Sequence, residues 1–128
     1  MTEPELREYL VLSCGQWHRH LTPEQIQTAI DAFYEWHGKL VAEGRAKVGS
    51  RLALERKRVS SQGVIDGPFS ESKEIIGGYW FYLARSLEEA AALAAQNPTM
   101  ACGLSFEIGE LDPERAVAGM RASETPDR

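Results

Sequence analysis

The segment Asp66-Gly67-Pro68-Phe69 holds the carboxylate best suited to chemistry in this chain. Gly67 precedes a proline and is biased to an extended or turn conformation, and Pro68 fixes its own backbone, so the segment is expected to be stiff. Asp66 has two alternative roles. Its carboxylate can accept hydrogen bonds from the amides of Phe69 or Ser70 and cap the turn, or it can act as an acid or base toward a bound molecule.

A cation follows this segment. The polar residues 70–74 are typical of a single helical turn with Ser70 as N-cap, and this turn would place the Lys73 ammonium near Asp66. A nearby positive charge would lower the pKa of the Asp66 carboxyl. We therefore take Asp66 as a candidate catalytic residue, and Lys73 and Phe69 as candidate ligand-binding residues.

His37 is the candidate second proton carrier. Ile26, Ile30, Phe33, His37 and Leu40 repeat at spacings of four and three, which predicts one stripe of a helix that packs on a sheet. An imidazole inside an apolar stripe must find a hydrogen-bond partner or lie at the edge of a cavity. His37 is therefore either a satisfied, partly buried histidine or a proton donor or acceptor that faces a ligand.

Two further histidines, His18 and His20, lie in a polar loop that follows a predicted strand. Their spacing suggests a metal site, but no third ligand lies within sequence reach, so no metal is expected. A loop at the carboxyl end of a strand can form the rim of a pocket. His18 and His20 are therefore candidate ligand-binding residues.

The segment that begins at Asp66 resembles the sequences of the YCII-related family. Within this family it resembles the branch known for a DGPF signature followed by a Lys-Glu pair and a glycine before a strand. These positions are Asp66-Gly67-Pro68-Phe69, Lys73-Glu74 and Gly77-Gly78, and the similarity extends from about residue 9 to about residue 110. The resemblance implies a ferredoxin-like fold that dimerises into an α+β barrel. Family members are proposed to be enzymes, mostly without assigned substrates. YCII proteins outside the DGPF branch carry a histidine on this helix, but it would fall near Phe33, so its role does not transfer to His37.

The elements that must position these side chains form a split βαβ arrangement of the α+β class with an antiparallel sheet. Thr22-Pro23-Glu24-Gln25 predicts a capping box, and Ser86-Leu87-Glu88-Glu89 predicts a second one. The strands are predicted from period-two alternation and from runs of strand-forming residues. In chain order we expect a strand at 9–13, a helix at 22–44, a strand at 46–55, a hairpin at 56–65, a strand at 79–84, a helix at 86–97 and a strand at 104–109.

The strand at 79–84 is aromatic on both faces. Two helices can cover one face of a four-stranded sheet, so the second face needs another cover. A homodimer with its sheets packed face to face would supply it, and Tyr79 or Trp80 could instead line a ligand pocket.

Composition limits the classes of function. The 128 residues have a net charge of -5 and no basic cluster beyond Arg56-Lys57-Arg58, so nucleic-acid binding is not expected. No run approaches the ~20 apolar residues of a membrane span, and the acidic N-terminus does not read as a signal peptide, so a cytoplasmic protein is expected. We expect one domain over residues 1–111 and a partly disordered extension over 112–128.

Three hypotheses on function remain open. The first is an enzyme-like protein that holds a small organic molecule and uses Asp66 and His37 for acid–base chemistry, without a cofactor. The second is a non-catalytic sensor of a small ligand that uses the same pocket. The third is a homodimeric protein-interaction module in which the Asp66 turn is purely structural.

Overall fold

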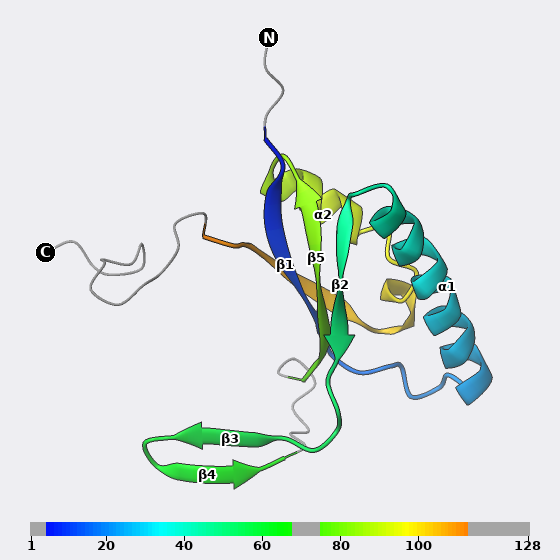
Figure 1. Cartoon of the computed structure of the whole chain (residues 1–128). Helices are drawn as coiled ribbons and strands as arrows, with labels where there is room; N and C mark the ends of the chain where they lie inside the picture. Colours follow the sequence, from blue (N-terminus) through cyan, green and yellow to red (C-terminus); the bar gives the residue numbers. More distant parts are fainter. Residues whose placement is uncertain (1–4, 68–74, 113–128) are drawn as a thin grey trace, which may run out of the picture.

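The computed structural model describes residues 5–67 and 75–112, which form a four-stranded sheet, two α-helices and a separate two-stranded hairpin (Figure 1). The elements are β1 (Arg7–Cys14), α1 (Pro23–Ala42), β2 (Ala46–Arg51), β3 (Lys57–Ser60), β4 (Gly63–Asp66), β5 (Ile76–Ala84), α2 (Leu87–Ala94), the 3-10 helix η1 (Met100–Cys102) and β6 (Ser105–Glu110).

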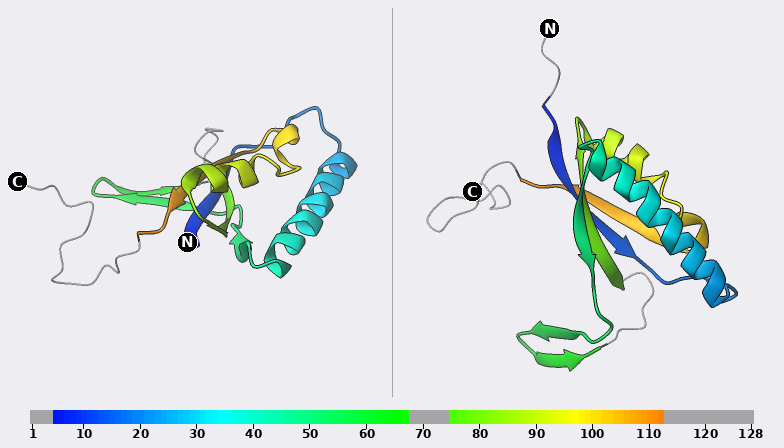
Figure 2. Two further views of the ribbon diagram at one scale, coloured as in Figure 1. Left: turned by 90° about the horizontal axis from the view of Figure 1, so that it is seen from above. Right: turned by 45° about the vertical axis from the view of Figure 1, so that its right-hand side comes forward.

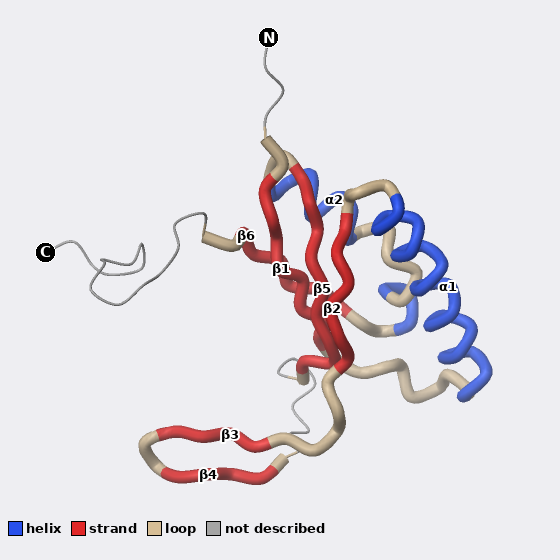
Figure 3. Tube along the Cα trace, in the orientation of Figure 1, coloured by secondary structure: helices blue, strands red, loops and turns tan. Residues whose placement is uncertain are grey.

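The strand order of the main sheet is β2-β5-β1-β6 (Figure 3). Every neighbouring pair of strands is antiparallel. The strands β1 and β2, which α1 connects, are separated by β5, and this is the split βαβ pattern. The arrangement confirms the predicted α+β class with an antiparallel sheet, and it is ferredoxin-like. In this order β1 and the aromatic strand β5 are the two interior strands.

The predicted start and end of α1 are confirmed. Thr22 accepts a hydrogen bond from the Gln25 amide at 3.1 Å, and the Gln25 side chain accepts one from the Thr22 amide at 2.8 Å. Gly44 follows the helix with a φ of 76°, a left-handed conformation that glycine adopts without strain. At α2, Ser86 accepts a hydrogen bond from the Glu89 amide, which is half of the predicted capping box. No helix of the described residues combines the length and apolar content that a membrane span requires.

Both helices lie on one face of the sheet, and the core lies between them and that face (Figure 2). On this helix-covered face, Tyr9, Val11 and Tyr82 are fully buried. Small residues of α2, among them Ala90 and Ala94, allow its backbone to approach the sheet closely. The partner residues in the ladders, such as Val11 with Trp80, share this face.

The other face of the sheet has no described helix over it and is called here the open face. Its side chains alternate with the buried ones along β1 and β5, and the rings of Tyr79 and Phe81 lie edge to face at 6.0 Å. Its apolar members are half-buried, and they are Leu10, Leu12, Tyr79, Phe81 and Leu83. The aromatic strand is therefore apolar on both faces, as predicted.

The predicted regular strand over 46–55 is wrong. The strand ends at Arg51, and its register shifts between Lys47 and Ser50, so that Val48 and Gly49 together stand opposite one residue of β5. A Cβ on Gly49 would lie 1.8 Å from the Tyr79 carbonyl oxygen, so glycine is what permits this β-bulge. Because of the extra residue, every later side chain of the strand lies on the face of the sheet opposite to the one expected for a regular strand.

The hairpin β3–β4, called here the arm, leaves the sheet on the side away from the helices (Figures 1 and 2). Its strands pair with each other from Lys57 with Asp66 to Ser60 with Gly63. Every residue of the two strands is exposed, including Val59, which is 73% exposed. The predicted hairpin is thus confirmed, and it contributes nothing to the core.

Candidate functional site

A cavity of about 250 Å³ lies between α1 and the helix-covered face of the sheet, where β1 ends and β5 begins. The lining is largely apolar and aromatic, with backbone at several glycines. It consists of Ser13, Gly15, Trp17, Ile30, Phe33, Tyr34, His37, Val48, Gly49, Ser50, Arg51, Gly77, Gly78, Tyr79, Trp80, Thr99 and Leu104.

Glycines help to explain why space remains here. Gly15, Gly49, Gly77 and Gly78 present backbone and no side chains at the end of the sheet that faces the first turns of α1. At Gly78 a Cβ would lie 2.8 Å from the Ser50 carbonyl oxygen, so the two strands approach too closely for a larger residue. The result is a hollow with strand backbone as part of its wall.

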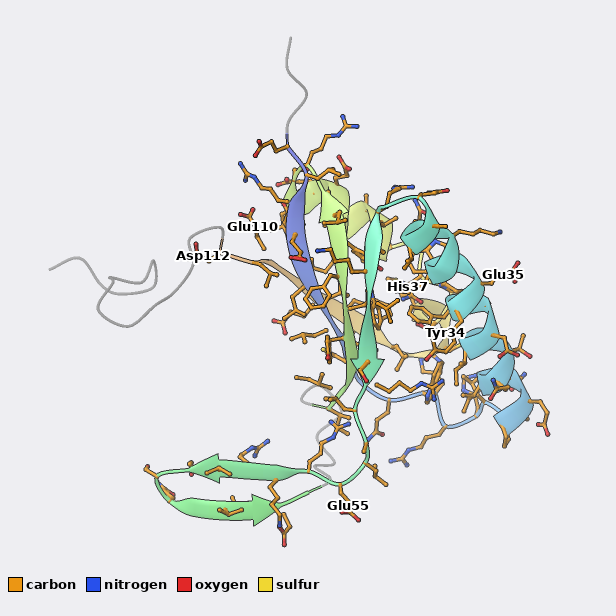
Figure 4. The ribbon with its side chains drawn as sticks, in the orientation of Figure 1. Tyr34, Glu35, His37, Glu55, Glu110 and Asp112 are labelled. Carbon is orange, nitrogen blue, oxygen red and sulfur yellow. The ribbon has the colours of Figure 1, made fainter. Side chains whose placement is uncertain are left out.

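His37 projects from α1 toward the sheet (Figure 4) and is 6% exposed. Its ring stacks on that of Phe33, with 5.2 Å between the ring centres and an interplanar angle of 15°. Its ring and that of Trp80 lie edge to face, with 5.9 Å between the ring centres. Its Nδ1 atom is buried and has no hydrogen-bond partner among the described residues. Burial lowers the pKa of His37, so the imidazole is neutral near pH 7. Its Nδ1 is thus a buried polar atom that the described residues leave unsatisfied.

Arg51 and Tyr34 come together at the cavity. The Arg51 Nε donates a hydrogen bond to the Tyr34 hydroxyl oxygen at 3.0 Å, and the guanidinium carbon lies 5.5 Å from the centre of the Tyr34 ring. Tyr34 also projects from α1 toward the sheet, whereas Glu35 points away from it (Figure 4). The contact thus joins the last residue of β2 to α1.

Asp66 does not line this cavity. It ends β4 on the arm, its side chain is 77% exposed, and its carboxylate accepts a hydrogen bond from the Lys57 ammonium at 2.5 Å. The structure therefore does not bring Asp66 and His37 together within one chain. Phe69, Ser70 and Lys73, which were expected to complete the Asp66 turn, lie outside the described residues.

Of the two aromatic candidates, Trp80 faces the cavity, and the centre of its ring lies 4.9 Å from that of Phe33. Tyr79 is a lining residue as well, but its ring lies with Phe81 on the open face. The aromatic strand therefore lines the cavity with one face, and no described helix covers its other face.

The rings of His18 and His20 stack on each other at 5.4 Å on the surface, and neither residue lines the cavity. Their neighbour Trp17 does. Across residues 5–67 and 75–112, no group of three or more histidine, cysteine, aspartate or glutamate side chains is arranged to hold a metal ion.

Sequence reasoning missed Tyr34 and Arg51. Tyr34 follows Ile30 by four residues and so extends the helical stripe, which was a usable signal. Arg51 gave none, because an unbroken alternation from Ala46 places it on the face opposite to the helices. The β-bulge at Gly49 brings it to the helix-covered face, opposite Gly78.

A family model, that of the YCII-related domain, matches residues 9–111 of the chain. The match includes every residue that lines the cavity, from Ser13 to Leu104. A search of the curated proteins gave no match.

Proposed function

We propose, from the premise that the chain belongs to the YCII-related family, that it binds a small organic molecule with a largely apolar body in the cavity between α1 and the sheet. The observation that carries the proposal is the lining itself, which is largely apolar and aromatic and includes the imidazole of His37 as one of its few polar side chains.

The cavity suits a compact ligand. Its volume of about 250 Å³ lies just below the ~300–1,000 Å³ of pockets for drug-sized molecules. Aromatic rings from Phe33, Trp80 and Trp17 offer surfaces on which a flat apolar body can stack. A ligand of one or two rings therefore fits the lining better than a long or highly polar one.

The proposal is one of ligand binding, with His37 as a polar member of the cavity lining. Acid–base chemistry shared between Asp66 and His37 is not part of it, because the two lie on separate elements and Asp66 is paired with Lys57. The segment Asp66-Gly67-Pro68-Phe69 supports placement in the DGPF-signature branch of the family.

The experiment uses two neutral probe molecules, indole and 2-naphthol, with binding followed by ligand-observed NMR. Ile30→Trp fills the cavity from α1, whereas Glu35→Trp places the same residue on the outer surface of the same helix. We expect at least one probe to bind the unmodified chain and Glu35→Trp, and to bind Ile30→Trp at least tenfold more weakly. Equal binding to all three chains, or to none, would refute the cavity as the site.

We also propose that the open face forms a homodimer interface and that two sheets pack face to face into an α+β barrel. The support is the half-buried apolar surface of Leu10, Leu12, Tyr79, Phe81 and Leu83, which the two helices leave uncovered. Contiguous exposed apolar surface on a sheet is typical of an interaction site. The dimer leaves the cavity accessible, because the cavity lies on the opposite face.

A further inference from the structure

We propose that the cavity selects organic carboxylates and that Arg51 is the specificity-determining residue that binds the carboxylate group. This inference rests on the proposed function, since it names the chemical class of the molecule that the cavity takes.

The charge of the lining carries the first step. Of the described residues that form the cavity, Arg51 is the one with a formal charge at neutral pH, and no aspartate or glutamate is among them. The whole chain has 19 acidic and 14 basic residues. Among the described residues the single charge of the site is positive, and this local charge favours an anion over a cation or a neutral molecule, although the chain as a whole has an excess of negative charge.

The position of Arg51 carries the second step. Its Nε is engaged by the Tyr34 hydroxyl and its guanidinium lies against the Tyr34 ring, so the side chain is held in place. Within residues 5–67 and 75–112, its terminal Nη atoms donate to no protein group, and no carboxylate lies within ion-pair distance of Arg51. As far as the described residues go, the planar end of the guanidinium is therefore available for a ligand.

The chemistry of the guanidinium carries the third step. Two parallel N–H donors match the two oxygens of a carboxylate, and such charge-assisted pairs are stronger than neutral hydrogen bonds. In a regular strand the Arg51 side chain would lie on the open face of the sheet. The β-bulge at Gly49 therefore brings this cation to the cavity. A flat carboxylate would place its ring against Trp80 and Phe33 and its anionic end at Arg51.

The experiment compares two molecules of the same shape, 2-naphthoate and 2-naphthamide, by isothermal titration calorimetry on the full chain. Arg51→Gln removes the charge and the paired donors, and Arg51→Lys keeps the charge without the planar fork. Arg45→Gln changes the net charge equally at a surface residue that pairs with Glu43 and does not line the cavity.

We expect the unmodified chain to bind naphthoate about five- to tenfold more tightly than naphthamide, with a smaller ratio at high salt. In Arg51→Gln the ratio should fall to about one while naphthamide binding is retained, which shows that the cavity is intact. Arg51→Lys should give an intermediate ratio, and Arg45→Gln should behave as the unmodified chain.

Naphthamide binding equal to or tighter than naphthoate binding in the unmodified chain would overturn this inference. So would the same loss of naphthoate binding in Arg45→Gln as in Arg51→Gln, because the effect would then come from net charge. If indole or 2-naphthol binds and the naphthoate preference is absent, the cavity remains a ligand site and the assignment of Arg51 fails. If no neutral or anionic probe binds, both proposals fail.

Discussion

Replacing His37 by phenylalanine is expected to stabilise the fold, and by a larger amount as the pH falls. The imidazole is 6% exposed, and its Nδ1 has no partner in the part of the chain that the structure describes. A buried polar group without a partner costs about 1–3 kcal/mol. A phenyl ring keeps the stacking on Phe33, and the adjoining cavity has room for its extra volume. We therefore expect a gain of about 1 kcal/mol near neutral pH.

The pH dependence follows from the lowered pKa of His37. As the pH falls below ~6.5, the ordinary histidine pKa, the unfolded chain binds a proton at this residue before the folded chain does. The free energy of unfolding of the unmodified protein then decreases by up to about 1.4 kcal/mol per pH unit. The His37→Phe variant lacks this contribution, so its advantage grows as the pH decreases from about 7 to 5.

Urea unfolding followed by circular dichroism, at equal protein concentration and at about pH 7, 6 and 5, measures both effects. His20→Phe is the control, because it removes one histidine from the exposed loop and adds the same ring. It should lack the gain in stability that His37→Phe shows near pH 7. A His37→Phe variant that is less stable than the unmodified chain near pH 7, with a parallel pH profile, would refute the reasoning and would mean that His37 has a stabilising partner.

Three further predictions concern the bulge, the open face and the arm. Gly49→Ala should lower the free energy of unfolding by about 1–3 kcal/mol, because the added Cβ would overlap the opposite strand. Gly38→Ala, on the exposed side of α1, should raise the free energy of unfolding by about 0.5–1 kcal/mol. Phe81→Glu should convert a dimer into a monomer in light scattering, whereas Val64→Glu on the arm should not. Asp66→Ala should cost less than about 1 kcal/mol in thermal unfolding, since its ion pair is largely exposed.

Each of these has a contrary result. Equal effects at the two glycines would mean that the bulge tolerates a side chain. An unmodified chain that is already monomeric at high concentration would exclude the dimer. A larger loss in Asp66→Ala that Asp66→Asn partly restores would identify the carboxylate as a turn cap.

The fold could be predicted to a large extent because its main signals are local. The capping box at Thr22, the helical stripe through His37 and the aromatic run of β5 each depend on residues close in sequence, and the structure contains all three elements. The β-bulge could not be predicted, because Gly49 is required by the approach of a strand 30 residues later, at Tyr79. The short helix η1 was also not expected.

The candidate site was less predictable, because it depends on how distant elements meet. His37 was found from its chemical contrast with the stripe around it. Arg51 could not be found, since a regular strand over 46–55 would direct its side chain away from the helices, and the one extra residue at the β-bulge exchanges the two faces for all that follows. Asp66 was paired with His37 on chemical grounds, but the length and direction of the arm, which decide where Asp66 lies, leave no periodic signal.

The arm and the main sheet differ in their stability against opening. Its backbone ladder joins β3 and β4 to each other, so the arm can open without breaking any ladder bond of the main sheet. A two-stranded hairpin alone is marginally stable in water, and local openings of this kind require far less free energy than global unfolding. Amide hydrogens of the arm should therefore exchange with solvent long before those of β1 and β5. A population with an opened arm and an intact sheet is thus a normal part of the native ensemble.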